Sequence, residues 1–286
     1  MTASKKKNTA RGRERLPPVS GFMFDLDGTL LLSDRSLGGY EVLPGAVDTL
    51  SALKSRGLPF VVLTNGSAYP PAEQAAKLRA LGLPVEDSQM LTPSSVTAHV
   101  MTRARVGRAL ILGSRGVAHA LAAAGIEVVF PGDAGAEAVD AVYVGWHPEC
   151  NMRDIEAACH AIWAGAKLYV ASDVPFFATR QGRTIGYSYA IVGAVRRMTR
   201  APMILTGKPS AHAMRFVARR LGVPISGVGV VGDDPGVEVV MARRLGAIAF
   251  GVTTGVTSAA GWAAQRGKYR PHRVLGRIDE LLSEPG

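Results

Sequence analysis

The segment that most constrains the fold is Phe22-Met-Phe-Asp-Leu-Asp-Gly-Thr-Leu30, an apolar run that ends in two carboxylates. The run is too short for a helix and lies between Gly21 and Gly28, so it is typical of a buried β-strand. Asp25 and Asp27 then lie where the strand passes into a loop, which in open α/β sheets is the edge where ligands bind. A surface turn is the alternative, because Asp, Gly and Thr all favour turns.

A second apolar strand is predicted at Pro59-Phe-Val-Val-Leu63, and it ends in the polar residues Thr64-Asn65-Gly66. Between the two strands, apolar residues at helical spacing predict a helix that Gly57 ends. A strand, a helix and a strand in so short a segment form a βαβ unit with parallel strands. We therefore expect Asp25 and Thr64 to face the same crevice.

Two later apolar segments, 202–206 and 227–231, also read as strands followed by polar residues. Lys208 follows the first segment, and Asp233 and Asp234 follow the second. If all four strands share one sheet, these groups converge on Asp25 and Thr64. Buried carboxylates beside one another need a compensating cation, and hard oxygen ligands favour Mg²⁺ over Zn²⁺.

An anion site is expected beside this cation site. Thr64 supplies a hydroxyl, and the backbone of Asn65-Gly66 offers N–H groups to an anion. The Lys208 ammonium can neutralise a phosphate and a carboxylate together. Together these groups predict a divalent-cation site beside an anion site.

The middle of the chain has strands and helices of its own and lacks the pattern of an apolar strand that ends on Asp. Strands are predicted at 109–112, 126–130, 141–144 and 167–171, and helices at 117–124 and 152–164. We therefore divide the chain into a core domain that carries the polar strand ends, residues 19–95 and 200–286, and an inserted α/β domain, residues 96–199. Residues 1–18 are expected to form a disordered basic tail.

Composition limits the partners and the compartment. The net charge is +10, but half of it lies in the first 15 residues, so the basic balance indicates a solubilising arm and no nucleic-acid partner is expected. No apolar run is long enough to span a membrane, and the basic N-terminus has no apolar segment directly behind it, so it is not read as a secretory signal. Cys150 and Cys159 form no C-x-x-C pattern, which suits a reducing compartment. A cytoplasmic protein is expected.

The motifs D-L-D-G-T at residue 25, T-N-G at residue 64, G-K-P at residue 207 and G-D-D at residue 232 occur in this order. Their order resembles that of the haloacid dehalogenase (HAD) superfamily of phosphohydrolases. The resemblance implies an α/β fold with a Rossmann-like parallel-sheet core. The long insertion after Thr64, the Gly-rich 143–149 segment and the G-K-P-S phrase resemble the 4-nitrophenylphosphatase and nucleotide-monophosphatase branch, whose inserted α/β cap defines type IIA.

The resemblance also implies roles for individual residues. Asp25 would attack phosphorus to give an aspartyl-phosphate, and Asp27 would protonate the leaving oxygen and then activate water. Thr64 and Lys208 would hold the transferring phosphoryl group, together with the Asn65-Gly66 backbone.

In the same comparison, Mg²⁺ would lie between the Asp25 carboxylate, the Asp27 carbonyl and Asp233, with Asp234 or Glu238 holding metal-bound water. The fourth motif departs from the usual G-D-x-x-x-T-D, since Glu238 stands where an Asp is usual. The outer ligands of the metal are therefore left open.

Substrate specificity is expected to lie in the cap, which carries no readable specificity motif. The candidates are His147, Asp173, Arg180, Arg183 and Tyr187. Ordinary structural roles remain as an alternative for His147 and the two arginines. Caps of this branch often carry a dimer interface, which leaves a homodimer as one option for the oligomeric state.

The leading hypothesis is a Mg²⁺-dependent phosphomonoester hydrolase that acts on a small phosphorylated metabolite. The alternative is a non-catalytic phosphate-ester-binding or regulatory protein, which the altered fourth motif suggests. A response-regulator receiver module also places Asp, Thr and Lys around Mg²⁺, but the motif order and the chain length disfavour it.

Overall fold

β1 (Gly21–Phe24) is an inner strand of a six-stranded parallel sheet in the computed structural model, which describes residues 16–34, 39–179 and 182–283. Its neighbours are β4 (Phe60–Leu63) and β13 (Val228–Gly232). The order is β15-β14-β13-β1-β4-β5, with β5 at Met90–Leu91, β14 at Ile248–Val252 and β15 at Arg273–Leu275. Because all these strands are parallel, their carboxyl ends meet at one edge of the sheet.

Alternate side chains of β1 point to opposite faces of this sheet, as expected for a buried strand. Phe22 and Phe24 pack on the face covered by α1 (Ala46–Ser55) and α2 (Pro71–Ala80). Met23 packs on the other face, which is covered by α7 (Ala211–Leu221), α8 (Val240–Leu245) and α9 (Ala259–Ala264). Both faces are therefore dry, as a central parallel strand requires.

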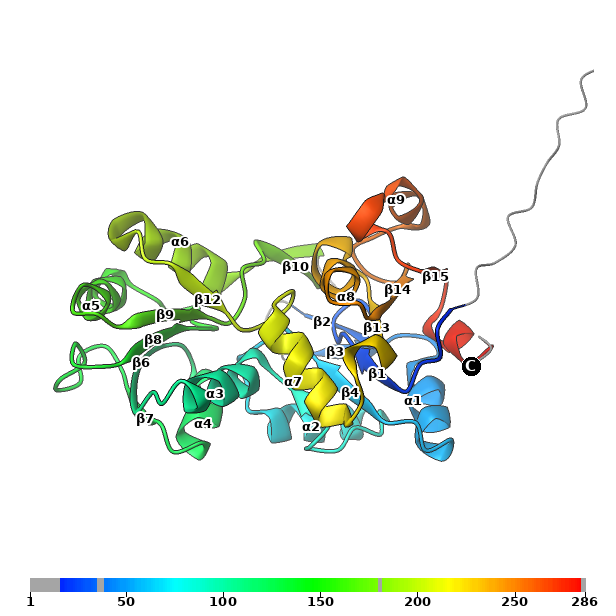
Figure 1. Ribbon diagram of the computed structural model, residues 1–286, viewed down its shortest axis with the longest axis horizontal. Helices are drawn as coiled ribbons and strands as arrows, with labels where there is room; N and C mark the ends of the chain where they lie inside the picture. The colour runs from blue at the N-terminus through cyan, green and yellow to red at the C-terminus, as the bar shows by residue number, and fades with distance from the viewer. Residues whose placement is uncertain (1–15, 35–38, 180–181, 284–286) are drawn as a thin grey trace, which may run out of the picture.

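A second parallel sheet lies beside the first, at the far end of the molecule from the C-terminus (Figure 1). Its order is β12-β9-β8-β6-β7, with β6 at Arg108–Leu112, β7 at Glu127–Val129, β8 at Ala141–Val144, β9 at Lys167–Val170 and β12 at Met203–Leu205. One face packs against α5 (Met152–Trp163) and α6 (Tyr187–Thr199), and the other against α3 (Pro93–Arg103) and α4 (Arg115–Ala123). The predicted α/β fold with two α/β units is confirmed.

One strand lies in a different sheet from the one we predicted. The segment 202–206 was expected to return to the first sheet, but β12 pairs with β9, with Met203 opposite Leu168. The strands of both sheets are short apolar runs, so their composition does not distinguish one sheet from the other. The loop after β12 therefore leaves the second sheet before the chain enters α7. The division into residues 19–95 with 200–286 and residues 96–199 stays a prediction.

Two hairpins were not predicted from the sequence. β2 (Leu31–Ser33) pairs with β3 (Tyr40–Val42), and β10 (Phe176–Thr179) pairs with β11 (Gly182–Ile185). Strands of three or four residues show too little alternation to be recognised. β2 and β10 contact each other, so the hairpins join the two halves of the molecule beside the site.

The helix that follows β13 begins as a wider turn. Residues Pro235–Val239 form a π-helix that continues into α8, and π-turns often occur at functional sites. A 3₁₀ helix, Ile278–Ser283, ends the described part of the chain. Over the described ranges, no helix is both long and apolar enough to cross a membrane. Most of the predicted basic tail, residues 1–15, lies outside those ranges.

Candidate active site

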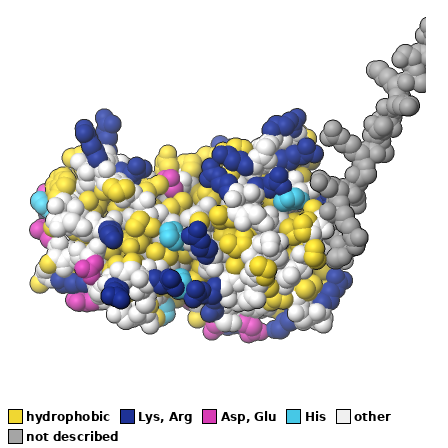
Figure 2. All heavy atoms as spheres, viewed as in Figure 1, with side chains coloured by type: hydrophobic (Ala, Val, Ile, Leu, Met, Phe, Trp, Pro, Cys, Tyr) yellow, Lys and Arg dark blue, Asp and Glu magenta, His cyan; other side chains and the backbone are white. Residues whose placement is uncertain are grey.

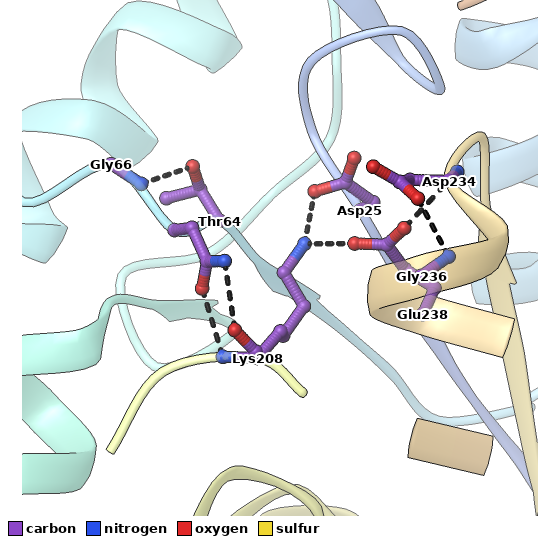
Figure 3. A network of polar contacts seen from close by, with 8 residues as sticks. Asp25, Thr64, Gly66, Lys208, Asp234, Gly236 and Glu238 are labelled. Atoms are coloured by element: carbon purple, nitrogen blue, oxygen red, sulfur yellow. Dashed lines mark hydrogen bonds and ion pairs between the residues drawn. The ribbon is translucent and has the colours of Figure 1, made fainter. Parts of the chain in front are cut away.

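The strand ends of the first sheet bring the predicted residues together (Figure 3). Asp25 follows β1, Thr64 follows β4 and Asp233 follows β13, and all three side chains are buried. Lys208 joins them from the loop between β12 and α7, and it is only 1 % exposed. Four segments that are distant in the sequence therefore meet at one edge of the sheet, as the strand pattern predicts.

The Lys208 ammonium connects two acidic residues. Its Nζ bonds to Asp25 Oδ1 and lies 2.8 Å from Glu238 Oε1. Burial opposes the charged form of Lys208, but the charges of Asp25 and Glu238 overcome that effect and raise the pKa of the ammonium. Lys208 therefore stays protonated at neutral pH and holds the Asp25 carboxylate in place.

Asn65 fixes the backbone that carries this lysine. Its side-chain Oδ1 accepts from the Lys208 N–H at 2.8 Å, and its Nδ2 donates to the Lys208 carbonyl at 3.0 Å. We predicted that the Asn65-Gly66 backbone would bind an anion, but the Gly66 N–H already donates to Thr64 Oγ1 at 2.8 Å. The Thr64 oxygen is thereby oriented, and its own hydrogen is the group that remains to donate to an anion.

Three buried carboxylates form a group that can bind a cation. One oxygen each from Asp25, Asp233 and Glu238 lies within 4.8 Å of the others. Burial, followed by the neighbouring acidic charges, raises the pKa of Asp233, and burial raises the pKa of Glu238 to about 7. Lys208 supplies one positive charge against these acids. A divalent cation fits this oxygen donor set and would relieve the remaining repulsion.

Asp234 and Glu238 were both candidates for the outer ligands of the metal. The carboxylate of Asp234 accepts from the Gly236 N–H at 2.7 Å and so caps the π-helix. The Asp234 N–H donates to Glu238 Oε2 at 3.3 Å. The structure brings Glu238 next to Asp25 and Asp233, whereas Asp234 has a capping contact of its own.

Two glycines make room for the Asp233 carboxylate, and sequence reasoning missed this function. A Cβ added at Gly28, where φ is +88°, would lie 2.3 Å from Asp233 Oδ2, and one added at Gly255 would lie 1.9 Å from the same atom. Gly255 belongs to the segment Thr253-Thr254-Gly255, which follows β14. Thr254 Oγ1 donates to the Gly28 carbonyl at 2.7 Å, so the two glycine loops are tied together.

Asp27 lies apart from the Lys208 contacts. Its Oδ1 accepts a hydrogen bond from Ser33 Oγ, a partner that we did not predict. Burial raises the pKa of Asp27 to about 6, against the opposing effect of the Ser33 bond. A carboxyl group with such a pKa exchanges a proton near neutral pH more readily than an ordinary aspartate does.

A small cavity of about 60 Å³ lies next to Asp27, with room for about two waters. Its walls come from both halves of the molecule, and they include Asn65, Gly66, Ser67, Trp146, Ser172, Phe177, Gly186, Tyr187 and Ser188. The Trp146 ring stands edge-on to Tyr187 at 4.6 Å and to Phe177 at 6.1 Å between centroids. Of the five cap candidates, Tyr187 is brought to this cavity. Trp146 was missed, although it directly precedes the candidate His147.

The other cap candidates that the structure describes do not line this cavity. His147 Nε2 lies 3.2 Å from Asp154 Oδ2, and the Arg183 guanidinium stacks 4.3 Å from the Phe176 ring centroid. The described residues that line the cavity do not include His147, Arg183 or Asp173. Burial raises the pKa of Asp173. Arg180 lies outside the described residues.

His147, Cys150 and Asp154 also bring one donor atom each within 4.8 Å. The same Asp154 oxygen accepts from the Asn151 N–H at 2.9 Å, as part of the capping box that begins α5. The helix cap thus accounts for this cluster, and we assign no metal to it.

Comparison with known proteins agrees with the geometry of the site. A family model described as haloacid dehalogenase-like hydrolase matches residues 22–127, and a second HAD-hydrolase-like model matches residues 205–281. Together the two matches cover more than half of the chain. The 5'-nucleotidase YutF of Bacillus subtilis is 27% identical over 83% of this chain and 88% of its own length.

Two solved structures show the same fold over nearly the whole chain. The p-nitrophenyl phosphatase of Archaeoglobus fulgidus has a TM-score of 0.82 at 26% identity, covering 93% of this chain and 99% of its own. The glycerol phosphate phosphatase of Mycobacterium tuberculosis in complex with magnesium has a TM-score of 0.80 at 28% identity, covering 92% of this chain and 76% of its own. The chain therefore belongs to the haloacid dehalogenase superfamily and is a phosphatase of its subclass IIA.

Proposed function

We propose that the protein is a Mg²⁺-dependent phosphomonoester hydrolase that works through an aspartyl-phosphate. The observation that carries the proposal is the contact of Lys208 with both Asp25 and Glu238 beside Thr64, at the edge of the parallel sheet. A buried ammonium between carboxylates suits a site that accepts the negative charge of a phosphoryl group.

In the first step, an Asp25 carboxylate oxygen attacks phosphorus, and the bond from phosphorus to the ester oxygen breaks. The leaving oxygen takes a proton from Asp27. A pKa raised to about 6 means that this carboxyl group holds a proton closer to neutral pH than an ordinary aspartate does. The products of this step are the free alcohol and phosphorylated Asp25.

In the second step, a water molecule attacks the phosphorus of phosphorylated Asp25, and Asp27 takes a proton from that water. The bond from phosphorus to the Asp25 oxygen breaks, which releases inorganic phosphate and restores the carboxylate. Thr64 and Lys208 hold the phosphoryl oxygens through both steps, and Asn65 keeps Lys208 in position.

Asp25, Asp233 and Glu238 would hold the metal, together with the Asp27 carbonyl that the resemblance implies. When bound, Mg²⁺ supplies positive charge that stabilises the developing charge on the phosphoryl oxygens. The buried, all-oxygen donor set supports this choice of metal, as does the magnesium complex of the M. tuberculosis relative.

The substrate in this proposal is a small phosphorylated metabolite. Relatives are named as an acid sugar phosphatase, a dihydroxyacetone phosphatase and a 5'-nucleotidase, all of which act on small phosphate esters. The cavity beside Asp27 is small and partly aromatic, which favours a compact leaving group.

No nucleic-acid partner is part of the proposal. A cytoplasmic location is supported by the free thiols of Cys150 and Cys159, and light scattering would test for a homodimer.

The deciding experiment measures hydrolysis of 4-nitrophenyl phosphate with and without Mg²⁺. We expect turnover that EDTA abolishes and that Asp25→Asn reduces to background. Asp48→Asn is the matched control, because Asp48 is an exposed aspartate of α1. Turnover by Asp25→Asn at the rate of the unaltered protein, or turnover that persists in EDTA, would contradict the mechanism.

A further inference from the structure

A basic groove lies between α3 and α7, outside the site described above. It has a volume of about 480 Å³ and is lined by His99, Val100, Arg103, Ala104, His212, Arg215, Phe216 and Arg219. Figure 2 shows Lys or Arg and His side chains gathered over these two helices. The volume suits a nucleotide-sized ligand.

Helical spacing places these groups on facing surfaces. His99 and Arg103 are four residues apart on α3, and Arg215 and Arg219 are four residues apart on α7. The two helices contact each other, so side chains from both converge on the groove. The groove is therefore formed by side chains of two helices, α3 and α7.

The groove is positively charged and contains no acid. None of Arg103, Arg215 and Arg219 has an ion pair within the part of the chain that the structure describes, and no Asp or Glu lines the groove. Burial, followed by the charges of Arg219 and Arg103, lowers the pKa of His99. Three guanidinium groups thus line one groove without a neutralising acid among the described residues, and a polyanion could pair with them through charge-assisted hydrogen bonds.

The floor of the groove is aromatic. The His99 and Phe216 rings lie 5.4 Å apart, and both are half-buried. A flat ligand can stack against such rings while its charged part meets the arginines. An inorganic anion would use the arginines but would leave the aromatic surface unused.

We propose that this groove binds a nucleoside polyphosphate, with its phosphates on Arg103, Arg215 and Arg219 and its base near Phe216 and His99. The site is distinct from the catalytic edge, since it shares no residue with it. α3 packs on the second sheet and α7 on the first, so the ligand would contact both halves of the molecule.

The test is isothermal titration calorimetry with ADP in EDTA, in which every variant is made in full-length Asp25→Asn protein so that turnover cannot interfere. Arg103→Gln/Arg219→Gln should raise the Kd for ADP about tenfold or more, because each lost contact is a charge-assisted hydrogen bond. Arg197→Gln/Arg244→Gln is the matched control, with the same loss of charge from exposed helical arginines. Its Kd should stay within about twofold of the parent, since a general charge effect is small at physiological salt.

Phe216→Leu separates the stacking contact from the charges. It should weaken ADP binding but leave the weaker binding of pyrophosphate unchanged, because pyrophosphate has no base. Equal Kd values for the groove variant and the control variant would overturn the proposal, as would a complete lack of ADP binding by the parent. A short RNA that binds the groove when ADP does not would overturn the assignment of a small ligand.

Discussion

Lys208 Nζ lies 2.8 Å from Glu238 Oε1, and both side chains are buried. Glu238 stands where the fourth motif of this branch usually has an aspartate. Its longer side chain contacts Lys208 and also lies beside the carboxylates of Asp25 and Asp233. Glu238→Gln keeps the shape but removes the charge. We expect it to raise the Mg²⁺ concentration needed for half-maximal activity by about 10- to 100-fold. A Mg²⁺ titration of 4-nitrophenyl phosphate hydrolysis measures this, with exposed Glu137→Gln as control. An unchanged Mg²⁺ requirement would show that Glu238 does not act at the metal.

Mg²⁺ should stabilise the folded protein, because it neutralises carboxylates that lie buried against one another. At 100 times its Kd, a ligand that binds only the folded state adds about 2.7 kcal/mol to the free energy of unfolding, which raises Tm by several degrees. Differential scanning calorimetry with Mg²⁺ or EDTA measures the shift. In Asp233→Asn the shift should shrink, and the metal-free protein should gain stability, since burial and neighbouring acids disfavour the charge of Asp233. A Tm that is the same with and without Mg²⁺ would argue against a metal at these carboxylates.

Asn65 should matter for turnover through Lys208. Asn65→Ala removes the two hydrogen bonds to the Lys208 backbone, and each buried group left unpaired costs about 1–3 kcal/mol. We expect kcat to fall about tenfold or more, because misplacement of a phosphate-binding group weakens transition-state stabilisation. Asn151→Ala controls for lost stability alone, since Asn151 caps α5 in the other half. A kcat in Asn65→Ala equal to that of Asn151→Ala would contradict this function.

Gly255→Ala should disable the site without unfolding the protein. The added methyl group would stand 1.9 Å from Asp233 Oδ2, so the carboxylate has to move. Activity should fall about 100-fold or more, as is typical when a group that stabilises transition-state charge is lost, while circular dichroism stays unchanged. Gly193→Ala in α6 is the control, since nothing lies within 4 Å of its added Cβ. Gly193→Ala should be fully active and about 0.5–1 kcal/mol more stable. Full activity of Gly255→Ala would mean that the Asp233 position is not needed.

Trp146 should affect substrate binding more than the chemical step. Its ring lines the cavity beside Asp27 and packs against Tyr187. Trp146→Ala should raise KM for aromatic esters about tenfold, because one lost ring contact is worth about 0.5–1.5 kcal/mol beyond buried area. Steady-state kinetics with 4-nitrophenyl phosphate and a sugar phosphate measure the effect. Trp163→Ala is the control, since Trp163 is 58% exposed on α5. A change in kcat with KM unaltered would place Trp146 in the chemistry instead.

Most of the polar site could be predicted from the sequence, because it follows from strand ends. Asp25, Thr64 and Asp233 each follow an apolar run, and parallel strands bring such ends to one edge. The residues that were missed have no such signal. Ser33, Trp146 and Gly255 act through contacts between distant segments, which local patterns do not encode. The cap candidates show the same limit, since Tyr187 alone of the four that the structure describes lines the cavity, while His147 pairs with Asp154.

The sheet to which β12 belongs could not be predicted from the sequence either. β12 has only three residues, and its side chains are half-buried, so nothing in its composition favours one sheet over the other. Its register with β9 depends on the packing of a whole layer. The placement of Lys208 beside Asp25 does not depend on that sheet assignment, because the loop after β12 reaches the site in either case.

The pairing of β12 with β9 limits how this protein can be re-engineered. The last strand of the second sheet and the lysine at the catalytic edge belong to one continuous segment, Met203 to Lys208. If a cap from a relative were joined before residue 203, the donor's counterpart of β9 would have to pair with β12 of this chain, and the donor cap would lose its own last strand. Chimeras that exchange substrate preference should therefore be joined after Lys208, the residue whose backbone contacts Asn65, so that the donor cap keeps its own last strand.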